Sequence, residues 1–283
     1  MSANHTRVES TTGLTVPQGA LAPQTSLDAQ SELLSIGEAR QWLLSLLLGG
    51  AIWELAGRAL RFSFLPPISS VLIAAADLIA SGQIAGHLLA SLGSLAIGYG
   101  LAVVGGLTLG LLVGRYRWAE VALAPYINAL LSTPKLVLVP ILYSLLGLGR
   151  GVQVAVIFLN AFFIITVNTA AGIRSVEASY IEMARVFGAG EGQLFRKVLL
   201  PGALPLTMAG LRLGIGSAVK GMITGEMLVT VSGLGALLRK YGSRFDSAQL
   251  FAVLLVVVGV ALLCTLFVQA IERRVTAWSE FGS

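Results

Sequence analysis

The sequence predicts an all-α, polytopic membrane protein with about six transmembrane helices, and three observations carry this prediction. Hydrophobic residues make up 55% of the chain and charged residues only 12%, whereas soluble domains carry about 25% charged residues. The apolar residues gather in blocks near the roughly 20 residues that a helix needs to cross a bilayer. The mean hydropathy of +0.84 agrees with a chain whose main solvent is lipid.

The elements follow in order along the chain. Residues 1–40 are rich in Ser, Thr, Gln, Ala and Pro without a sustained apolar period, which predicts a flexible cytoplasmic N-terminal tail. Residues 41–283 form the predicted transmembrane domain. The candidate spans lie near residues 41–60, 89–114, 121–146, 152–173, 203–231 and 250–271. An even number of spans places both termini on one side of the membrane.

The distribution of basic residues indicates that this side is the cytoplasm, because inner loops carry an excess of Lys and Arg. Ten basic residues then lie inside: Arg7, Arg40, Arg115, Arg117, Arg174, Arg185, Arg196, Lys197, Arg273 and Arg274. Six lie outside: Arg58, Arg61, Arg150, Arg239, Lys240 and Arg244. Three of these outer charges belong to the last outer loop, which weakens the bias.

Between the first two spans, Leu65-Pro66-Pro67 ends the helix, because proline cannot continue it. Residues 71–85 then predict a short, largely apolar helix, which we expect at the outer interface of the membrane.

Glycines recur at every fourth position in two spans, as Gly106, Gly110 and Gly114 and as Gly210 and Gly214. Small residues at this period let two helices approach closely in lipid. The pattern has two interpretations, packing within the chain or a dedicated interface between subunits.

A hydrophilic insert at residues 177–201 separates the fourth and fifth spans. Residues 180–187 predict a short helix, and Gly188 and Gly190 accept the left-handed conformation that ends a helix. Residues 193–200 predict a second short helix, stopped by Pro201 at the membrane entrance. Such a helix–turn–helix is suited to docking on a partner, and the alternative is a solvated loop without a special role.

This insert resembles the signature of the membrane subunits of bacterial binding-protein-dependent ABC importers. The signature is Glu-Ala-Ala, three residues, Gly, nine residues, Ile, any residue and Leu-Pro. The matching positions are Glu182, Met183, Ala184, Gly188, Val198, Leu200 and Pro201. Every spacing is kept, while Met and Val replace the second Ala and the Ile.

Further stretches are similar to the branch of this family that imports sulfonates, taurine, nitrate or bicarbonate. They are Phe64-Leu65-Pro66, residues 86–92, residues 134–149, Gly210-Leu211-Arg212 and Gly225-Glu226-Met227. The resemblance implies a permease subunit of the bacterial inner membrane that forms the pathway for a small anionic solute. It implies as partners a second, identical permease copy, a dimer of cytoplasmic ABC ATPase subunits and a periplasmic or lipid-anchored solute-binding protein.

The resemblance also implies that residues 177–201 couple the ATPase to the permease. Glu182 would anchor this segment by pairing with a nearby base, and Gly188 would allow the sharp turn. Leu200 and Pro201 would lock the segment to the fifth span. ATP and Mg²⁺ would be bound by the partner ATPase, with no cofactor on this chain.

The absence of catalytic motifs argues against an enzyme. No lysine follows a glycine, so the chain has no Gly-Lys-Ser/Thr phosphate loop. The patterns G-x-G-x-x-G, H-E-x-x-H and G-x-S-x-G are absent too. His5, His87 and Cys264 are too few and too far apart for a zinc site, and no basic domain is available to bind nucleic acid.

Polar groups within the spans are candidates for a translocation pathway, because a charge at the bilayer centre costs about 3 kcal/mol. Lys220 is placed to lower the barrier for an anion, and pairing with a carboxylate or carbonyl of a neighbouring helix is the alternative. Glu226, Asn160 and Asn168 are further pathway candidates, with interhelical hydrogen bonding as the alternative for the two asparagines. Arg212 is expected to extend to the cytoplasmic edge.

Two rival classes remain, an ion-coupled secondary transporter and a membrane enzyme. A secondary transporter is expected to show an internal repeat with broken helices or a relay of buried carboxylates. The chain shows no clear repeat, and Glu226 is its one deep carboxylate. The sequence leaves open the identity of the solute, the identity of the second permease and the role of the tail.

Overall fold

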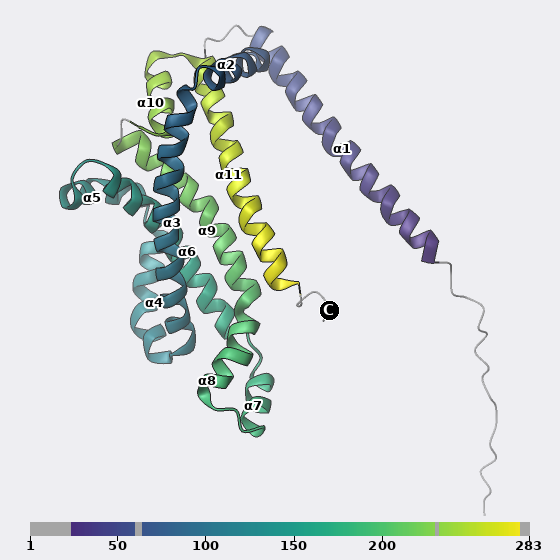
Figure 1. Cartoon of the computed structure of the whole chain (residues 1–283), viewed down its shortest axis with the longest axis vertical. Coiled ribbons are helices and arrows are strands. Elements are labelled where there is room, and N and C mark those ends of the chain that lie inside the picture. The colour runs from purple at the N-terminus through teal and green to yellow at the C-terminus, as the bar shows by residue number, and fades with distance from the viewer. Residues whose placement is uncertain (1–23, 60–63, 230–231, 278–283) are drawn as a thin grey trace, which may run out of the picture. The chain divides into compact units, whose positions relative to one another are not determined.

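The structure is a computed structural model that describes residues 24–59, 64–229 and 232–277 (Figure 1). Every regular element in these residues is helical, which confirms the predicted all-α class. The chain divides into two compact units, residues 1–55 and 56–283, and each is described by itself.

The helix α1 (Gln24–Ala59) makes up the described part of the first unit and continues into the second. It starts earlier than the predicted span, so residues 24–40 of the predicted flexible tail are helical. Their Leu, Ala, Gln, Glu and Arg residues are good helix formers. Residues 1–23 of the predicted tail lie outside the described residues. Although α1 contains the predicted span 41–60 up to Ala59, it is not among the helices that are apolar enough to cross a membrane.

Four helices of the second unit are long and apolar enough to span a membrane. They are α3 (Gln83–Arg115), α6 (Arg150–Arg174), α9 (Leu200–Val229) and α11 (Ser247–Thr276). They correspond to the predicted spans 89–114, 152–173, 203–231 and 250–271, of which residues 230–231 lie outside the described part. A bent helix pair supplies a fifth candidate. The polytopic class is thus confirmed, and the count of six spans stays a prediction.

The third predicted span, 121–146, is not one straight helix. It is divided between α4 (Arg117–Ser132) and the pair η1 (Lys135–Leu138) and α5 (Val139–Leu146), with a 97° bend between them. The expectation of a continuous helix is wrong because Pro134 follows Thr133. A residue before proline is forced out of the helical region, and Thr133 is extended, with ψ 131°.

The glycines of α3 pack against α6 within the chain. A methyl group added to Gly106 would lie 2.9 Å from Cβ of Ile165, and one on Gly110 would lie 2.6 Å from Cβ of Thr169. Gly114 meets α6 in the same way one turn further on. Gly210 and Gly214 of α9 also face α6. The interpretation of the glycine pattern as packing within the chain is therefore confirmed, and α6 is the helix on which α3 and α9 converge.

We predict that Gly110→Val destabilises this helix pair. The new side chain would meet the Thr166 carbonyl oxygen as well as Thr169, and overpacking of this kind costs about 1–3 kcal/mol. A lower melting temperature of the purified protein in detergent would verify the loss. Gly100→Val is the control, because an added Cβ at Gly100 of α3 would meet no atom of a neighbouring helix within 4 Å. This variant should leave the melting temperature almost unchanged.

Shorter helices lie at the two ends of the second unit (Figure 1). At one end are α2 (Ile68–Ala80), which contains most of the short apolar helix predicted at residues 71–85, and α10 (Leu234–Arg244), which the sequence did not predict. Residues 83–85 of that prediction belong to α3 instead. At the other end are α7 (Ala178–Val186), α8 (Glu191–Leu194) and the π-helical turn η2 (Phe195–Leu199). These last three form the hydrophilic insert.

Candidate functional site

The insert folds as two short helices joined by a sharp turn at Gly188. The N–H of Gly188 donates to the Arg185 carbonyl, and the N–H of Ala189 donates to the Ala184 carbonyl at 3.0 Å. This pair of bonds is a Schellman motif, which needs a left-handed residue after the helix. Gly188 fills that position with φ +77°, so the turn predicted there is observed.

The second short helix of the insert does not stop at Pro201, contrary to our expectation. Residues 191–228 form one continuous helix of 38 residues. The π turn makes this continuity compatible with proline, because a proline ring clashes with the carbonyl four residues earlier in an ordinary α-helix. The N–H of Leu200 instead donates to the Phe195 carbonyl, five residues back. Leu200 and Pro201 therefore join the insert to α9 without a break.

Apolar packing and one ion pair fasten the insert to the helix ends beneath it, and a second ion pair lies within the insert. Leu199 is buried with Ile173 of α6 and Ala203 of α9, and Ile181 and Phe195 pack against the same cluster. Glu191 accepts hydrogen bonds from Arg115 of α3 and from Arg185 of α7. Exposed ion pairs contribute little stability, so the apolar cluster supplies most of the attachment.

One face of α7 is apolar and exposed. Tyr180, Met183, Val186 and Phe187 lie within an arc of about 120° by helical geometry, and we call them the α7 apolar face. Val186 and Phe187 are 85% and 83% exposed. A compact group of exposed large apolar side chains indicates a protein interaction site. The insert therefore has the shape and surface of a docking element.

The other signature residues of the insert divide between this surface and its support. Glu182 is exposed and has no ion pair with any described residue, and the ion pairs of the insert are made by Glu191 instead. The Ala184 carbonyl accepts the hydrogen bond from the Ala189 N–H in the turn. Val198 is half-buried and Leu200 is 38% exposed.

The predicted pathway residues lie on α6 and α9 and differ in exposure. Lys220 is exposed on α9. The side-chain amides of Asn160 and Asn168 are half-buried on α6 and donate to the carbonyls of Val156 and Ile164, each 2.8 Å away on the same helix. These bonds are within α6 and not between helices. Arg212, which we expected to extend to the edge, forms an ion pair of 3.2 Å with Glu272 of α11.

Glu226 has no exposed surface, so its position argues against a place along an open pathway. Its carboxylate accepts hydrogen bonds from Nε2 of Gln153 at 2.7 Å and from the Gly235 N–H at 2.8 Å. Sequence reasoning considered only the position of Glu226 in a span, and its partners on α6 and α10 became known only through the fold.

Glu226 belongs to a group of side chains that cap the N-terminus of α10. The N–H groups at a helix start have no partner within the helix, and the N-cap Gly233 has no side chain to supply one. The Gly233 N–H donates to Nδ1 of His87, and the Leu234 N–H donates to Oγ of Ser91. Residues 86–92 and 225–227 were noticed for their resemblance to the importer branch, which is the one signal of this role in the sequence.

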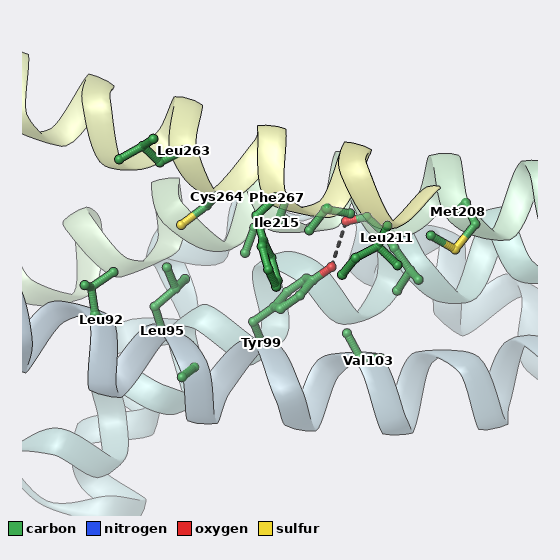
Figure 2. A pocket seen from close by; sticks show the side chains of 13 residues that line it. Leu92, Leu95, Tyr99, Val103, Met208, Leu211, Ile215, Leu263, Cys264 and Phe267 are labelled. Carbon is green, nitrogen blue, oxygen red and sulfur yellow. Dashed lines mark hydrogen bonds between the residues drawn. The ribbon is translucent and has the colours of Figure 1, made fainter. Parts of the chain in front are cut away.

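A separate apolar pocket of about 570 Å³ lies among α3, α9 and α11. Figure 2 shows Leu263, Cys264 and Phe267 on one side and Tyr99 on the other. The Tyr99 hydroxyl donates to the Leu211 carbonyl at 2.9 Å, and the rest of the lining is almost wholly apolar. This pocket offers an anionic solute no charged group and is not a candidate for its pathway.

Fold and site together define a polytopic helical membrane protein that carries a docking element at one end. Residues 106–277 match the family described as binding-protein-dependent transport system inner membrane component. The chain belongs to this family. It is thus a transport subunit of the inner membrane and not an enzyme.

Several relatives have names that specify a solute. The chain is 32% identical over 242 residues to the putative aliphatic sulfonates transport permease protein SsuC of Bacillus subtilis, which covers 84% of this chain and 88% of the relative. It is 30% identical over 220 residues to the taurine transport system permease protein TauC of Escherichia coli (76% and 80% covered). It is 32% identical over 190 residues to the nitrate import permease protein NrtB of Synechocystis (67% and 69% covered).

The fold is similar to that of a solved ABC transporter. A chain of the inward-facing MetNI methionine ABC transporter matches with a TM-score of 0.61 and 23% identity, over 69% of this chain and 96% of that chain. At this level of identity the likeness supports the fold alone.

Proposed function

We propose that this chain is the permease subunit of an ATP-binding-cassette importer that carries a small anionic solute of the sulfonate, taurine, nitrate or bicarbonate class. A solute-binding protein delivers the solute, and a dimer of separate ATPase subunits binds ATP and Mg²⁺ and drives transport. In the orientation that we propose, both termini and the insert face the cytoplasm. Figure 1 shows the ends of the second unit that would then face the cytoplasm, at α7 and α8, and the outside, at α10.

The α7 apolar face is the observation that carries this proposal. A permease has no ATPase site of its own, so movement of the ATPase must reach it through a rigid contact. The insert supplies an apolar surface for that contact, and its buried attachment to α6 and α9 resists bending. Residues 177–201 would therefore act as the coupling segment, with Glu182 available for a basic residue of the ATPase.

The continuous helix at residues 191–228 gives the movement a path across the membrane. Its 38 residues span about 57 Å at 1.5 Å per residue, which exceeds the hydrocarbon core of about 30 Å. A displacement at Glu191 is transmitted along this helix to Glu226, where the cap of α10 begins.

Lys220 supports a pathway shared with a second permease copy. Its side chain is exposed in the single chain, and it lies eight residues, or about 12 Å, before the end of the continuous helix. A charged side chain at this depth needs water or protein around it. A second copy that faces α9 across a polar passage would provide both, and the positive charge would favour an anion.

The experiment that tests the function is reconstitution. The permease is purified with the ATPase and solute-binding protein encoded beside its gene, inserted into proteoliposomes and supplied with ATP. We expect ATP-dependent accumulation of the solute that stabilises the binding protein in a thermal-shift screen of sulfonates, taurine, nitrate and bicarbonate. Accumulation driven by an ion gradient without the ATPase would overturn the proposal in favour of a secondary transporter.

We predict that Gly188→Ala lowers uptake severalfold. A side chain at φ +77° costs about 1–2 kcal/mol, and this strain opposes the turn that presents the α7 apolar face. Gly190→Ala is the matched control, since Gly190 has φ −71° and equally open surroundings, and it should transport normally. Uptake in proteoliposomes measures both, and equal rates for the two variants would contradict a role for the turn.

We predict that Lys220→Met reduces solute uptake at least tenfold and leaves assembly with the ATPase intact. Loss of the positive charge of Lys220 raises the electrostatic barrier for an anion in the passage. Lys220→Arg, which keeps the charge, should retain most of the uptake. Undiminished uptake by Lys220→Met, with complex formation confirmed by size-exclusion chromatography, would remove Lys220 from the pathway.

A further inference from the structure

The exposed side of α10 is basic. Its inner side is buried through Leu234, Leu237, Leu238 and Tyr241, among other residues. The opposite side exposes Arg239, Lys240 and Arg244, which we call the α10 basic face. By helical geometry these three residues lie within an arc of about 140°.

The location of this face is unusual for a membrane protein. α10 lies at the end of the second unit opposite α7 and α8 (Figure 1), which is the outer end in the orientation proposed above. Basic residues are selected against in short outer loops, because they favour retention in the cytoplasm. Three basic residues within six positions therefore disfavour the orientation that places α10 outside the membrane. A function at the outer surface would account for their presence.

The chain itself leaves much of this charge available. Neither Lys240 nor Arg244 has an ion pair with a described residue. The Lys240 ammonium lies 5.2 Å from the centre of the Tyr241 ring, which holds the cation at the surface. Arg239 differs from both, because it donates a hydrogen bond to the Met227 carbonyl at 3.1 Å and so supports the end of α9.

The basic face borders a hollow that can receive a protruding acidic side chain. This hollow has a volume of about 540 Å³ and lies between α10 and the start of α3, where His87, Arg239, Lys240 and Ser243 line it. The lining contains no carboxylate. Arg244 lies outside the hollow, so the positive surface is wider than one small anion would occupy.

We propose that the α10 basic face docks an acidic surface of the solute-binding protein. This inference rests on the proposed function and adds to it the site and the chemistry of the contact. Charge complementarity raises the association rate and fixes the orientation of a partner. The His87–Gly233 hydrogen bond ties α10 to α3, and the Glu226–Gly235 hydrogen bond ties it to α9. A partner on α10 is therefore linked to α9, the helix that the coupling segment drives from its other end.

The test measures binding of the solute-binding protein to the permease–ATPase complex in nanodiscs. The double variant Lys240→Gln/Arg244→Gln should bind more weakly, with a Kd raised about tenfold at low ionic strength. Salt screens exposed charges within about 3 Å at 1 M, so the difference from the parent should disappear there. Arg239 is left unchanged, because its bond to Met227 is structural.

The matched control is Arg273→Gln, which removes an exposed basic residue at the end of α11 and should leave the Kd unchanged. ATP hydrolysis without the solute-binding protein should also be unchanged in both variants, which shows that they are folded. A double variant with the parent's Kd and salt dependence would overturn the proposal. The proposal would also be overturned if the double variant differed from the parent only in how its stability depends on the anionic lipid content of the nanodisc. The basic face would then bind lipid headgroups.

The outcomes also separate this proposal from the proposed function. If the parent complex neither binds the solute-binding protein nor hydrolyses ATP faster in its presence, the function itself fails. If the parent is stimulated normally and the double variant is stimulated equally at every concentration of binding protein, only the docking surface fails.

Discussion

Val186→Asp/Phe187→Asp is expected to abolish ATP-driven uptake while the permease still folds. Both side chains are more than four-fifths exposed in the isolated chain, so the change removes almost no internal packing. In the complex, each apolar side chain buried in a groove of the ATPase contributes about 1.5–3 kcal/mol. The loss of two corresponds to at least a hundredfold weaker association, and an uncompensated carboxylate in the groove weakens it further.

Two measurements test this result, copurification of the ATPase with the variant and the melting temperature of the permease alone. The first should fall to background and the second should stay the same. Ala178→Asp is the control, because Ala178 is exposed on the opposite side of α7, and it should copurify normally. Normal uptake by the double aspartate variant would show that the α7 apolar face is not the contact that transmits force.

Glu226→Ala is expected to destabilise the fold by about 2–6 kcal/mol, because two buried donors lose their acceptor at about 1–3 kcal/mol each. Without the carboxylate, the Gly235 N–H at the start of α10 and the Gln153 amide lose their acceptor in a site closed to water. The helix dipole adds to the loss, because a negative charge at a helix N-terminus is stabilising. The last turn of α9 and the first turn of α10 should separate together.

Thermal unfolding in detergent, followed by tryptophan fluorescence, measures this loss. Asp77→Ala removes an exposed carboxylate at the same end of the molecule and should change stability by less than 0.5 kcal/mol, as surface substitutions usually do. Glu226→Gln keeps the shape and one acceptor oxygen and should lie between the two. A melting temperature for Glu226→Ala equal to that of Asp77→Ala would contradict the structural role of Glu226.

The helical membrane class and the docking insert could both be predicted from local pattern. Long apolar blocks have few stable forms in lipid other than helices, and residues 177–201 stand out because they interrupt those blocks. Gly188 was predictable as well, because its role depends on backbone conformation at one position. These features depend on residues close together in the chain.

Other features depended on neighbours that are distant in sequence. Pro201 was expected to stop a helix, but the π turn before it keeps residues 191–228 continuous. Glu226 was considered as a pathway residue, whereas its partners Gln153 and Gly235 make it a buried cap. α10 was treated as a loop, since its inner face becomes recognisable only when α9 and α11 are present to cover it.

The sequence by itself determined that lipid is the main solvent of this protein, the approximate positions of its four long apolar helices and the location of its docking insert. The physical reason is that hydrophobic length and turn chemistry act locally and need no knowledge of the fold. The tertiary structure decided which charges are buried and which face outward, because burial depends on the helices that pack around a residue. It thereby separated the enclosed Glu226 from the exposed Lys220, and the buried side of α10 from its basic face.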